Sequence, residues 1–188
     1  LWYEVYIEEL KYNLTEGVDH AARKLRLEPN GSLVFLGLSA GECVASLRAT
    51  YQKYSKLEFE YGVWLPRQKI GEVSRLIAKR KFRKTDLTAH ILIACFYFNK
   101  ETGNENLYDF VVINSTSKLL PFYYMFGFTK ITDDLVIHPD IKNESYLLKC
   151  SKQNNKKAIA EIENIMAGNL LLKAKWGLKY WWYKRVSR

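Results

Sequence analysis

The order of apolar and polar residues predicts a series of strands in the first half of the chain. Residues 32–38 (SLVFLGL) and 42–51 (ECVASLRATY) are rich in strand-forming residues and flank a Ser-Ala-Gly turn, which is typical of a β-hairpin. Residues 57–65 (LEFEYGVWL) alternate for part of their length and stop at Pro66, and residues 72–78 (EVSRLIA) follow the next turn. We expect these two segments to form a third and a fourth strand.

A helix and a further strand are predicted after the fourth strand. Thr85 or Asp86 can cap a helix whose apolar residues recur every three to four positions from Leu87 to Phe98. A loop then returns the chain to an apolar segment, residues 107–113. Because a helix joins the two strands, we expect them to lie parallel in a βαβ unit.

The two ends of the chain are predicted to be helical. Residues 1–12 have apolar and acidic residues at helical spacing, and residues 158–167 have an apolar face. Two short segments, residues 135–138 and 145–150, are predicted to form a closing hairpin. Residues 18–27 are not assigned.

One stretch, residues 119–128 (LLPFYYMFGF), combines aromatic residues with a glycine after a predicted buried strand at residues 109–114. Residues 122–126 fit about one and a half helical turns. Gly127 suits the position after a helix end, where a left-handed conformation carries no Cβ penalty. Tyr123 would then lie one turn before the cap, with its hydroxyl over the strand. Core packing with a helix cap explains the same cluster, so this stretch alone does not decide between packing and chemistry.

Composition predicts a soluble, globular protein of one domain with an appended C-terminal element. The 188 residues are 48% hydrophobic and 26% charged, and the chain is long enough to bury a substantial core. No apolar run approaches the roughly 20 residues that cross a bilayer, and no signal peptide is visible, so we expect a cytoplasmic location. The chain starts at Leu1 rather than methionine, which leaves a preceding segment open.

Cysteine and histidine spacing predicts neither a disulfide nor a metal site. The cysteines are odd in number, widely spaced and set in apolar runs, and we expect them to be reduced, buried thiols: Cys43, Cys95 and Cys150. The histidines are equally scattered: His20, His90 and His138.

The net charge of +9 and the pI near 9.3 predict an acidic partner, such as nucleic acid, an anionic membrane, or an acidic protein or cofactor. Zinc-finger, ribonucleoprotein, Walker, dinucleotide-binding and HExxH motifs are all missing from the sequence, and we expect no nucleic acid. One cluster of cations, residues 79–84 (KRKFRK), lies between a predicted strand and a helix start, where free N–H groups and the helix dipole favour an anion. The basic, aromatic residues 170–188 fit a packed terminal helix, a dock for an acidic carrier protein, or an interfacial helix on anionic lipid.

Two motifs resemble known acyltransferases. The pattern Phe-Tyr-x-x-x-Gly-Phe at residues 122–128 resembles the last block of the Gcn5-related N-acetyltransferase (GNAT) superfamily, whose tyrosine is often the general acid that protonates the leaving thiolate. Residues 72–76 (EVSRL) resemble the Glu-x-x-Arg-Leu/Phe strand of acyl-homoserine-lactone synthases and bacterial long-chain N-acyl amino acid synthases, which are GNAT-like enzymes with acyl carrier protein donors. In the usual GNAT loop, Gln/Arg-x-x-Gly-x-Gly/Ala, Arg83 matches but both glycines are missing from residues 83–88. The two families also have basic loops there, and the resemblance covers roughly residues 19–128.

The resemblance implies an α/β fold with a GNAT-like central sheet. The sheet is expected to be mixed and mostly antiparallel, with flanking helices and a βαβ unit that binds the acyl carrier. Residues 1–150 are expected to form the acyltransferase domain. Residues 151–188 are expected to form a helical, basic and aromatic extension packed on or beside it.

The resemblance also implies the residues of a site. Glu72 is expected to take a proton from the acceptor amine, directly or through water, and Tyr123 to protonate the thiolate. Arg75 is expected either to bind an acceptor carboxylate or to form a structural salt bridge with Glu72. Arg48 lies where GNAT proteins commonly have an arginine on this strand, and it is expected either to bind an acceptor or to be a structural, solvated strand residue. The residues expected to bind the phosphopantetheine arm of the carrier are Ile77, Ala78, Lys79, Arg80, Arg83, Lys84, Leu87 and Thr88. The aromatic residues expected to line an acyl pocket are Phe96, Phe122, Tyr124 and Phe126.

The predicted function is transfer of a fatty acyl chain from a carrier thioester to the amine of an amino acid. The donor is acyl carrier protein or an acyl coenzyme A (acyl-CoA) substrate, and no tightly bound cofactor is expected. One alternative is fatty acylation of a lysine or ornithine side chain in a peptide. Another is a non-catalytic GNAT-like module that binds an acyl carrier or, through the C-terminal tail, a membrane periphery. Homoserine-lactone synthesis is a weaker branch, because no pocket for S-adenosylmethionine is identified.

Overall fold

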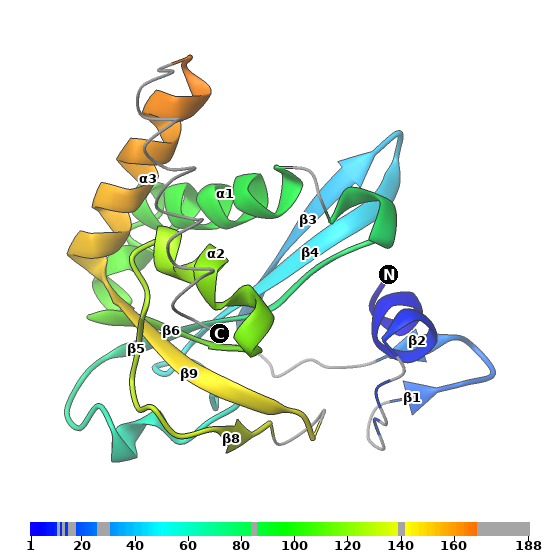
Figure 1. Ribbon diagram of the computed structural model, residues 1–188, viewed down its shortest axis with the longest axis horizontal. Helices are drawn as coiled ribbons and strands as arrows, with labels where there is room; N and C mark the ends of the chain where they lie inside the picture. Colours follow the sequence, from blue (N-terminus) through cyan, green and yellow to red (C-terminus); the bar gives the residue numbers. More distant parts are fainter. Residues whose placement is uncertain are drawn as a thin grey trace.

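The computed structural model describes residues 1–10, 12, 14, 18–25, 31–83, 86–138 and 142–168, and it contains a central sheet (Figure 1). The strands run in the order β3 (Ser32–Ser39), β4 (Glu42–Tyr51), β5 (Ile70–Ala78), β6 (Phe110–Ser115), β9 (Glu144–Ser151) and β7 (Thr129–Lys130), and β8 (Val136–Ile137) also pairs with β9. Every pairing in this sheet is antiparallel except that of β5 with β6. The expected mixed, mostly antiparallel sheet is confirmed.

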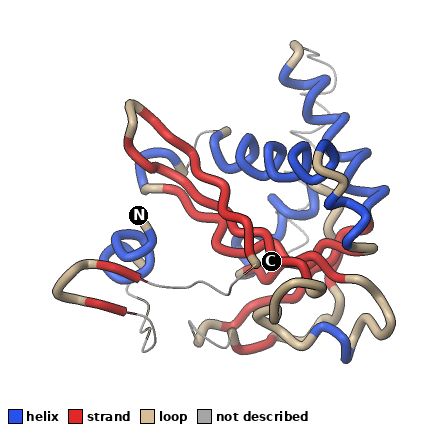
Figure 2. The backbone as a smooth tube through the Cα atoms, turned by 180° about the vertical axis from the view of Figure 1, so that it is seen from behind, coloured by secondary structure: helices blue, strands red, loops and turns tan. Residues whose placement is uncertain are grey.

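Helices lie on both sides of the sheet (Figure 1 and Figure 2). On one side, α1 (Leu87–Glu101), α2 (Leu120–Met125) and α3 (Lys152–Met166) share the main hydrophobic core. On the other side lies a π-helix, η1 (Glu4–Glu9), near a small hairpin of β1 (Val18–Asp19) and β2 (Lys24–Leu25). The 3₁₀ turns are η2 (Tyr61–Val63), η3 (Arg80–Phe82), η4 (Asn104–Leu107) and η5 (Ser117–Leu119).

Alternation along β4 decides which side chains reach each face of the sheet. Ala45, Leu47 and Ala49 belong to the main core under the helices. Ser46 and Arg48 lie between them in the sequence and therefore point to the opposite face. There Ser46 accepts a hydrogen bond from the indole of the N-terminal Trp2. The helix-covered face is thus apolar, and the face under η1 carries polar groups.

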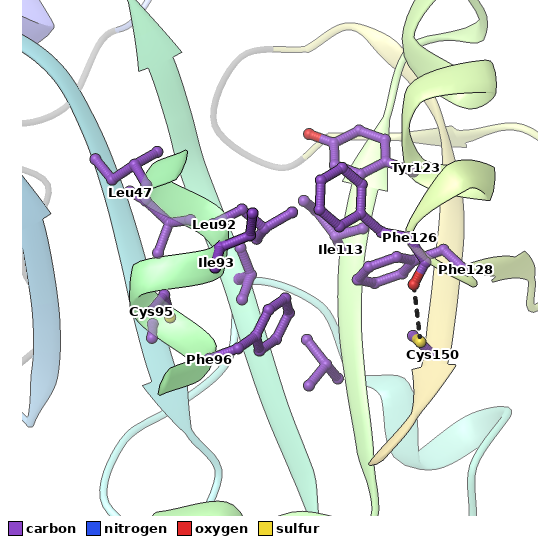
Figure 3. Close-up of a cluster of buried hydrophobic side chains, with 14 of the residues drawn as sticks. Leu47, Leu92, Ile93, Cys95, Phe96, Ile113, Tyr123, Phe126, Phe128 and Cys150 are labelled. Atoms are coloured by element: carbon purple, nitrogen blue, oxygen red, sulfur yellow. Dashed lines mark hydrogen bonds between the residues drawn. The ribbon is translucent and has the colours of Figure 1, made fainter. Parts of the chain in front are cut away.

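The main core joins α1, α2 and the middle of the sheet. Figure 3 shows Leu92 and Phe96 of α1 and Phe126 and Phe128, which border the end of α2, gathered with Ile113 of β6. All five side chains are buried. Burial of a side chain of this size stabilises the fold by about 1.5–3 kcal/mol.

Most predicted elements are present with shifted ends. The hairpin of β3 and β4 and the unit of β5, α1 and β6 are confirmed. The aromatic helix α2 ends before Gly127, which has the expected left-handed backbone with φ 80°. Helix α3 starts at Lys152, earlier than the predicted residue 158. The cysteines are free, and two of them are buried as expected: Cys95 and Cys150.

The predicted third strand at residues 57–65 is wrong. The segment contains the short helix η2 and no strand. Leu57, Tyr61 and Leu65 recur every four residues and pack against Ile70 in a second buried cluster. The apolar residues that suggested a strand therefore form the buried side of an irregular loop.

The division into residues 1–150 and 151–188 stays a prediction. Helix α3 packs on the main core through Ile162. The predictions for residues 169–188, and for Lys84 and Thr85, lie outside the described residues.

Candidate active site

The parallel strands β5 and β6 pair briefly and then leave a cleft between them. They pair over residues 70–72 and 110–112. Beyond these pairs a cleft of ≈ 160 Å³ lies between residues 74–77 of β5 and residues 113–116 at the end of β6. Side chains from η1, α2, the loop before β5 and the segment after β8 complete its walls.

A bulge in β5 turns an arginine toward this cleft. Strand β4 pairs Arg48 with Ser74 and Ser46 with Ile77, so Arg75 and its neighbour fall opposite a single residue of β4. Arg75 has a left-handed backbone with φ 54°, which is uncommon for a residue other than glycine. The bulge breaks the simple alternation of the strand. As a result, Arg75 lines the cleft beside Ser74, although the two are adjacent in the sequence.

Glu58, from the loop before β5, is the centre of a buried cluster of charged side chains. Its Oε1 accepts a hydrogen bond from Arg48 Nη2 at 2.5 Å and lies 3.0 Å from Arg75 Nη2. Its Oε2 lies 3.2 Å from Nε2 of His138. All four side chains are at most 8% exposed. Because a buried carboxylate requires such partners, the cluster ties the Glu58 loop and the His138 segment to the sheet.

Glu58 and Glu72 are adjacent carboxyl groups with opposite pKa shifts. The backbone N–H of Glu58 donates to Oε2 of Glu72 at 2.9 Å. Burial, reinforced by the charge of Glu58, raises the pKa of Glu72 from 4.5 to about 8. Burial also works to raise the pKa of Glu58, but the hydrogen bond from His138 and the charges of Arg75 and Arg48 outweigh it and hold that pKa below 4.5. At neutral pH, Glu58 is therefore the charged carboxylate and Glu72 is mostly the neutral acid.

Two buried tyrosines also line the cleft. Tyr6 extends from η1, and the guanidinium of Arg75 lies 5.7 Å from the centre of its ring. Burial raises the pKa of Tyr6 to about 12 although the Arg75 charge opposes this. Burial, reinforced by Tyr6, raises the pKa of Tyr123 well above 10. Both phenols therefore hold their protons at neutral pH.

Two cations of the predicted anion-binding loop are paired with acidic side chains. Lys79 Nζ lies 2.9 Å from Oε2 of Glu4 and 2.7 Å from Oε1 of Glu42. Arg83 forms an ion pair with Glu9. Since Glu4 and Glu9 both belong to η1, this helix neutralises part of the charge expected to meet the donor.

The other predicted carrier-binding residues have different surroundings. Ile77 lines the cleft, whereas Ala78 belongs to the main core and its carbonyl accepts a hydrogen bond from Arg83 Nε at 2.8 Å. Arg80 is exposed. The first turn of α1 holds two half-buried residues, Leu87 and Thr88.

The four aromatic residues of the predicted acyl pocket do not line the cleft. Phe96 lines a separate groove between α1 and α3. Phe126 is buried in the main core, and Phe122 and Tyr124 pack against that core. Figure 3 shows Phe96 and Phe126 in the core between the helices and the sheet, and an acyl pocket made from the four residues stays a prediction.

Comparison with known proteins gives matches at the level of structure. No protein-family model matches the sequence, and no curated protein matches it significantly. FeeM, an N-acyl amino acid synthase from uncultured soil microbes, is 16% identical with a TM-score of 0.59 over 79% of this chain and 86% of that one. BjaI, a CoA-dependent acyl-homoserine lactone synthase, is 14% identical with a TM-score of 0.61 over 86% of this chain and 78% of that one. The fold is GNAT-like.

A third solved structure agrees with this fold. An acyl-CoA N-acyltransferase from Pseudomonas aeruginosa is 16% identical with a TM-score of 0.53 over 80% of this chain and 86% of that one. Within the GNAT-like fold of this chain, no helix among the described residues is both long and apolar enough to span a membrane.

The cleft residues that the sequence analysis missed include Tyr6, Glu58 and His138. Glu58 was placed in a predicted strand that does not form, and His138 was counted among scattered histidines. The two side chains meet across 80 residues of sequence. Apolar and polar patterning carries no signal for such a distant pair.

Proposed function

We propose that this protein is an N-acyltransferase that moves a fatty acyl chain from a carrier thioester to the amine of an amino acid. One observation carries the proposal: a cleft between diverging parallel strands is lined by Arg75, Glu58, Tyr6 and Tyr123 in a GNAT-like fold. The three solved structures described above are named as an N-acyl amino acid synthase, an acyl-homoserine lactone synthase and an acyl-CoA N-acyltransferase.

The donor is proposed to enter where β5 and β6 separate. The strand edge at Ile77 faces the cleft, so the amides of a pantetheine arm would bond there as an added strand does. Lys79, Arg80 and Arg83 lie just beyond, at the end of the strand, where the phosphates of CoA or of a carrier protein would follow.

The reaction requires few groups because a thioester is already activated. The amine attacks the carbonyl carbon, and the carbon–sulfur bond breaks as the amide forms. Tyr123 is proposed to protonate the departing thiolate, since its phenol keeps its proton at neutral pH and lines the cleft. Glu72 meets the expected condition of a raised pKa, yet it is not among the residues that line the cleft. Its bond to the Glu58 N–H fits a positioning role.

The charge of the cluster favours an acceptor that carries a carboxylate. Arg48 and Arg75 supply two positive charges, whereas Glu58 supplies one negative charge and Glu72 is mostly neutral. Arg75 lines the cleft, so the carboxylate of an amino acid bound there would meet a guanidinium, which supports a free amino acid over a simple alkyl amine.

The test is an assay of thiol release and product mass. Acyl-CoA and acyl carrier protein donors of short to long chain length are each incubated with amino acids, a lysine-containing peptide or S-adenosylmethionine. We expect free thiol to appear together with an N-acyl amino acid. If thiol is released only with the peptide, the acceptor is a side-chain amine of a peptide and not the amine of a free amino acid. If the protein binds a donor but releases thiol with no combination of donor and acceptor, the proposal that it is an enzyme is wrong, and a carrier-binding module is favoured.

A further inference from the structure

Strand β3 forms one edge of the central sheet, and the proposed reaction gives this edge no role. Among the residues that the structure describes, β3 pairs with β4 alone. Figure 1 and Figure 2 both show the β3–β4 hairpin projecting from the rest of the sheet. At the other end of the sheet the strands are short, since β7 and β8 have two residues each. We propose that β3 is the contact surface of a homodimer, in which β3 of a second copy pairs with it antiparallel and joins the two sheets.

The sequence of β3 lacks the features that usually protect an edge strand. Proteins block such edges with charged side chains, proline, bulges or very short strands. Residues 32–39 (SLVFLGLS) contain no charged residue and no proline, and the strand is eight residues long. The register shift against β4 leaves Val44 with no residue opposite, so the extra residue belongs to β4 and β3 itself stays regular. The outward N–H and C=O groups of β3 therefore favour a partner strand.

Apolar side chains lie on both faces of β3. On the helix-covered face, Phe35 packs against the main core, and its ring lies edge-on to that of Phe98 with centroids 5.5 Å apart. On the opposite face, the alternate residues Val34, Leu36 and Leu38 are 44%, 57% and 65% exposed. Apolar residues on both faces are typical of a strand inside a sheet, not of one at its edge.

The pattern of β3 favours a second copy of this chain as the partner. A two-fold axis at Leu36 would run the two strands antiparallel and continue each face of one sheet into the same face of the other. Val34 of each copy would then lie opposite Leu38 of the other copy, and the two Leu36 side chains would lie opposite each other. Because β3 has no charged residue, this pairing buries no charge, although each chain carries a net charge of +9.

The expected dimer is weak and forms outside the cleft. Eight residues on each side provide about eight backbone hydrogen bonds and a narrow strip of apolar contact, which is less than the interface of a permanent dimer. Strand β4 separates β3 from β5, and the cleft lies between β5 and β6. This inference therefore does not depend on the proposed acyl transfer, and either one can fail without the other.

Sedimentation velocity of the wild type and of charge variants, at protein concentrations from about 1 to about 200 µM, tests the dimer. We expect the wild type to change from monomer to dimer over this range. Leu36→Lys and Leu36→Glu should each raise the dimer Kd at least about fivefold, because like charges then lie opposite each other. An equimolar mixture of the two variants should dimerise again, since opposite charges then meet. Ile137→Lys, at a similarly exposed position on β8, is the matched control and should dimerise as the wild type does.

Hydrogen exchange locates the contact without any variant. The amide protons of residues 32–39 should exchange more slowly at high than at low protein concentration. The homodimer through β3 is wrong if the wild type stays monomeric over the whole range, or if a dimer forms while exchange at residues 32–39 does not change. It is also wrong if Ile137→Lys weakens the dimer as much as Leu36→Lys does. If an added lysine-containing peptide slows exchange at residues 32–39 of a monomeric protein, the edge binds an extended peptide instead.

Discussion

At the scale of single residues, the protonated Glu72 predicts how stability depends on pH. Its pKa is near 4.5 in ordinary surroundings and about 8 in the fold. Between these values the folded state holds a proton that the unfolded chain has released, so the free energy of unfolding falls as pH rises. In Glu72→Gln the side chain is neutral at every pH, so this decrease in the free energy of unfolding is absent. The wild type should therefore lose up to about 1.4 kcal/mol per pH unit relative to the variant.

Urea unfolding at several pH values between about 5 and about 8 measures this difference. Glu58 has a lowered pKa, so its contribution is lost only as pH falls below 4.5, outside the window. Glu60→Gln, at an exposed position two residues from Glu58, is the matched control and should follow the wild type. If the free energy of unfolding changes with pH in the same way for wild type and Glu72→Gln, Glu72 is ionised in the folded protein.

The phenol of Tyr123 predicts a defect that depends on the leaving group. Tyr123→Phe should lower kcat between about tenfold and a hundredfold with an alkyl thioester, because the thiolate loses its proton donor. With an aryl thioester, whose thiolate leaves without protonation, the defect should shrink to about threefold or less. Tyr108→Phe removes another buried hydroxyl outside the cleft and should leave both rates unchanged. Equal losses with both donors would instead indicate that Tyr123 shapes the cleft.

At the residue scale, sequence and structure differ in the buried charged cluster around Glu58. Glu72 and Arg75 were found because they lie three residues apart in one recognisable strand motif. The bulge that brings Arg75 beside Ser74 in the cleft depends on the register against β4, which no local pattern encodes. Glu58 was missed because it lies in residues 57–65, for which the sequence analysis predicted a strand that does not form. The motif thus includes Arg75, which lines the cleft, whereas Glu58 comes beside it only through tertiary pairing.

At the scale of elements, the π-helix η1 is predicted to compete with the donor. Its carboxylates Glu4 and Glu9 pair with Lys79 and Arg83, the cations proposed to meet the donor phosphates. A Glu4→Gln/Glu9→Gln variant removes both ion pairs made by η1, while Lys79 keeps its pair with Glu42 and the apolar residues of η1 still pack. The donor KM should fall about two- to fivefold, in line with roughly 0.5–1 kcal/mol for partly exposed ion pairs.

The measurement is donor KM at low and at physiological ionic strength. Glu8→Gln is the matched control, since Glu8 pairs with Arg23 instead of the basic loop. A rise in donor KM in the double variant would show that η1 orders the loop for the donor. The direction of the change in donor KM therefore tells whether η1 competes with the donor for the cations or orders the basic loop for the donor.

Elements with a strong local period were predictable, and elements set by packing were not. The β3–β4 hairpin and α1 carry their own turn and helical spacing. The sequence pattern of residues 1–12 predicted a helix but did not show that η1 is a π-helix. Helices of this kind are rare, and the spacing of apolar residues does not distinguish them from α-helices. Residues 57–65 form no strand because their apolar side packs on Ile70.

At the scale of the whole molecule, the fold followed from two short motifs and the order of elements. The strand, basic loop and helix of the βαβ unit, together with the aromatic turn ending at Gly127, were enough to indicate a GNAT-like sheet. Overall sequence similarity adds nothing here, since the solved structures that share the fold are 14–16% identical. A fold held by burial patterns tolerates such divergence, because many apolar combinations fill the same core.

The net charge of +9 predicts how kcat/KM for each kind of donor depends on ionic strength. An acidic carrier protein meets this charge over a wide surface, acyl-CoA meets it only through its phosphates, and acyl-pantetheine carries no phosphate. Raising ionic strength from low to physiological should therefore lower kcat/KM most for acyl carrier protein, less for acyl-CoA and hardly at all for acyl-pantetheine. The assay is thiol release for donors of the same acyl chain at matched pH. If acyl carrier protein and acyl-pantetheine show the same salt dependence, the charge does not attract the donor, and the positive surface serves a different acidic partner.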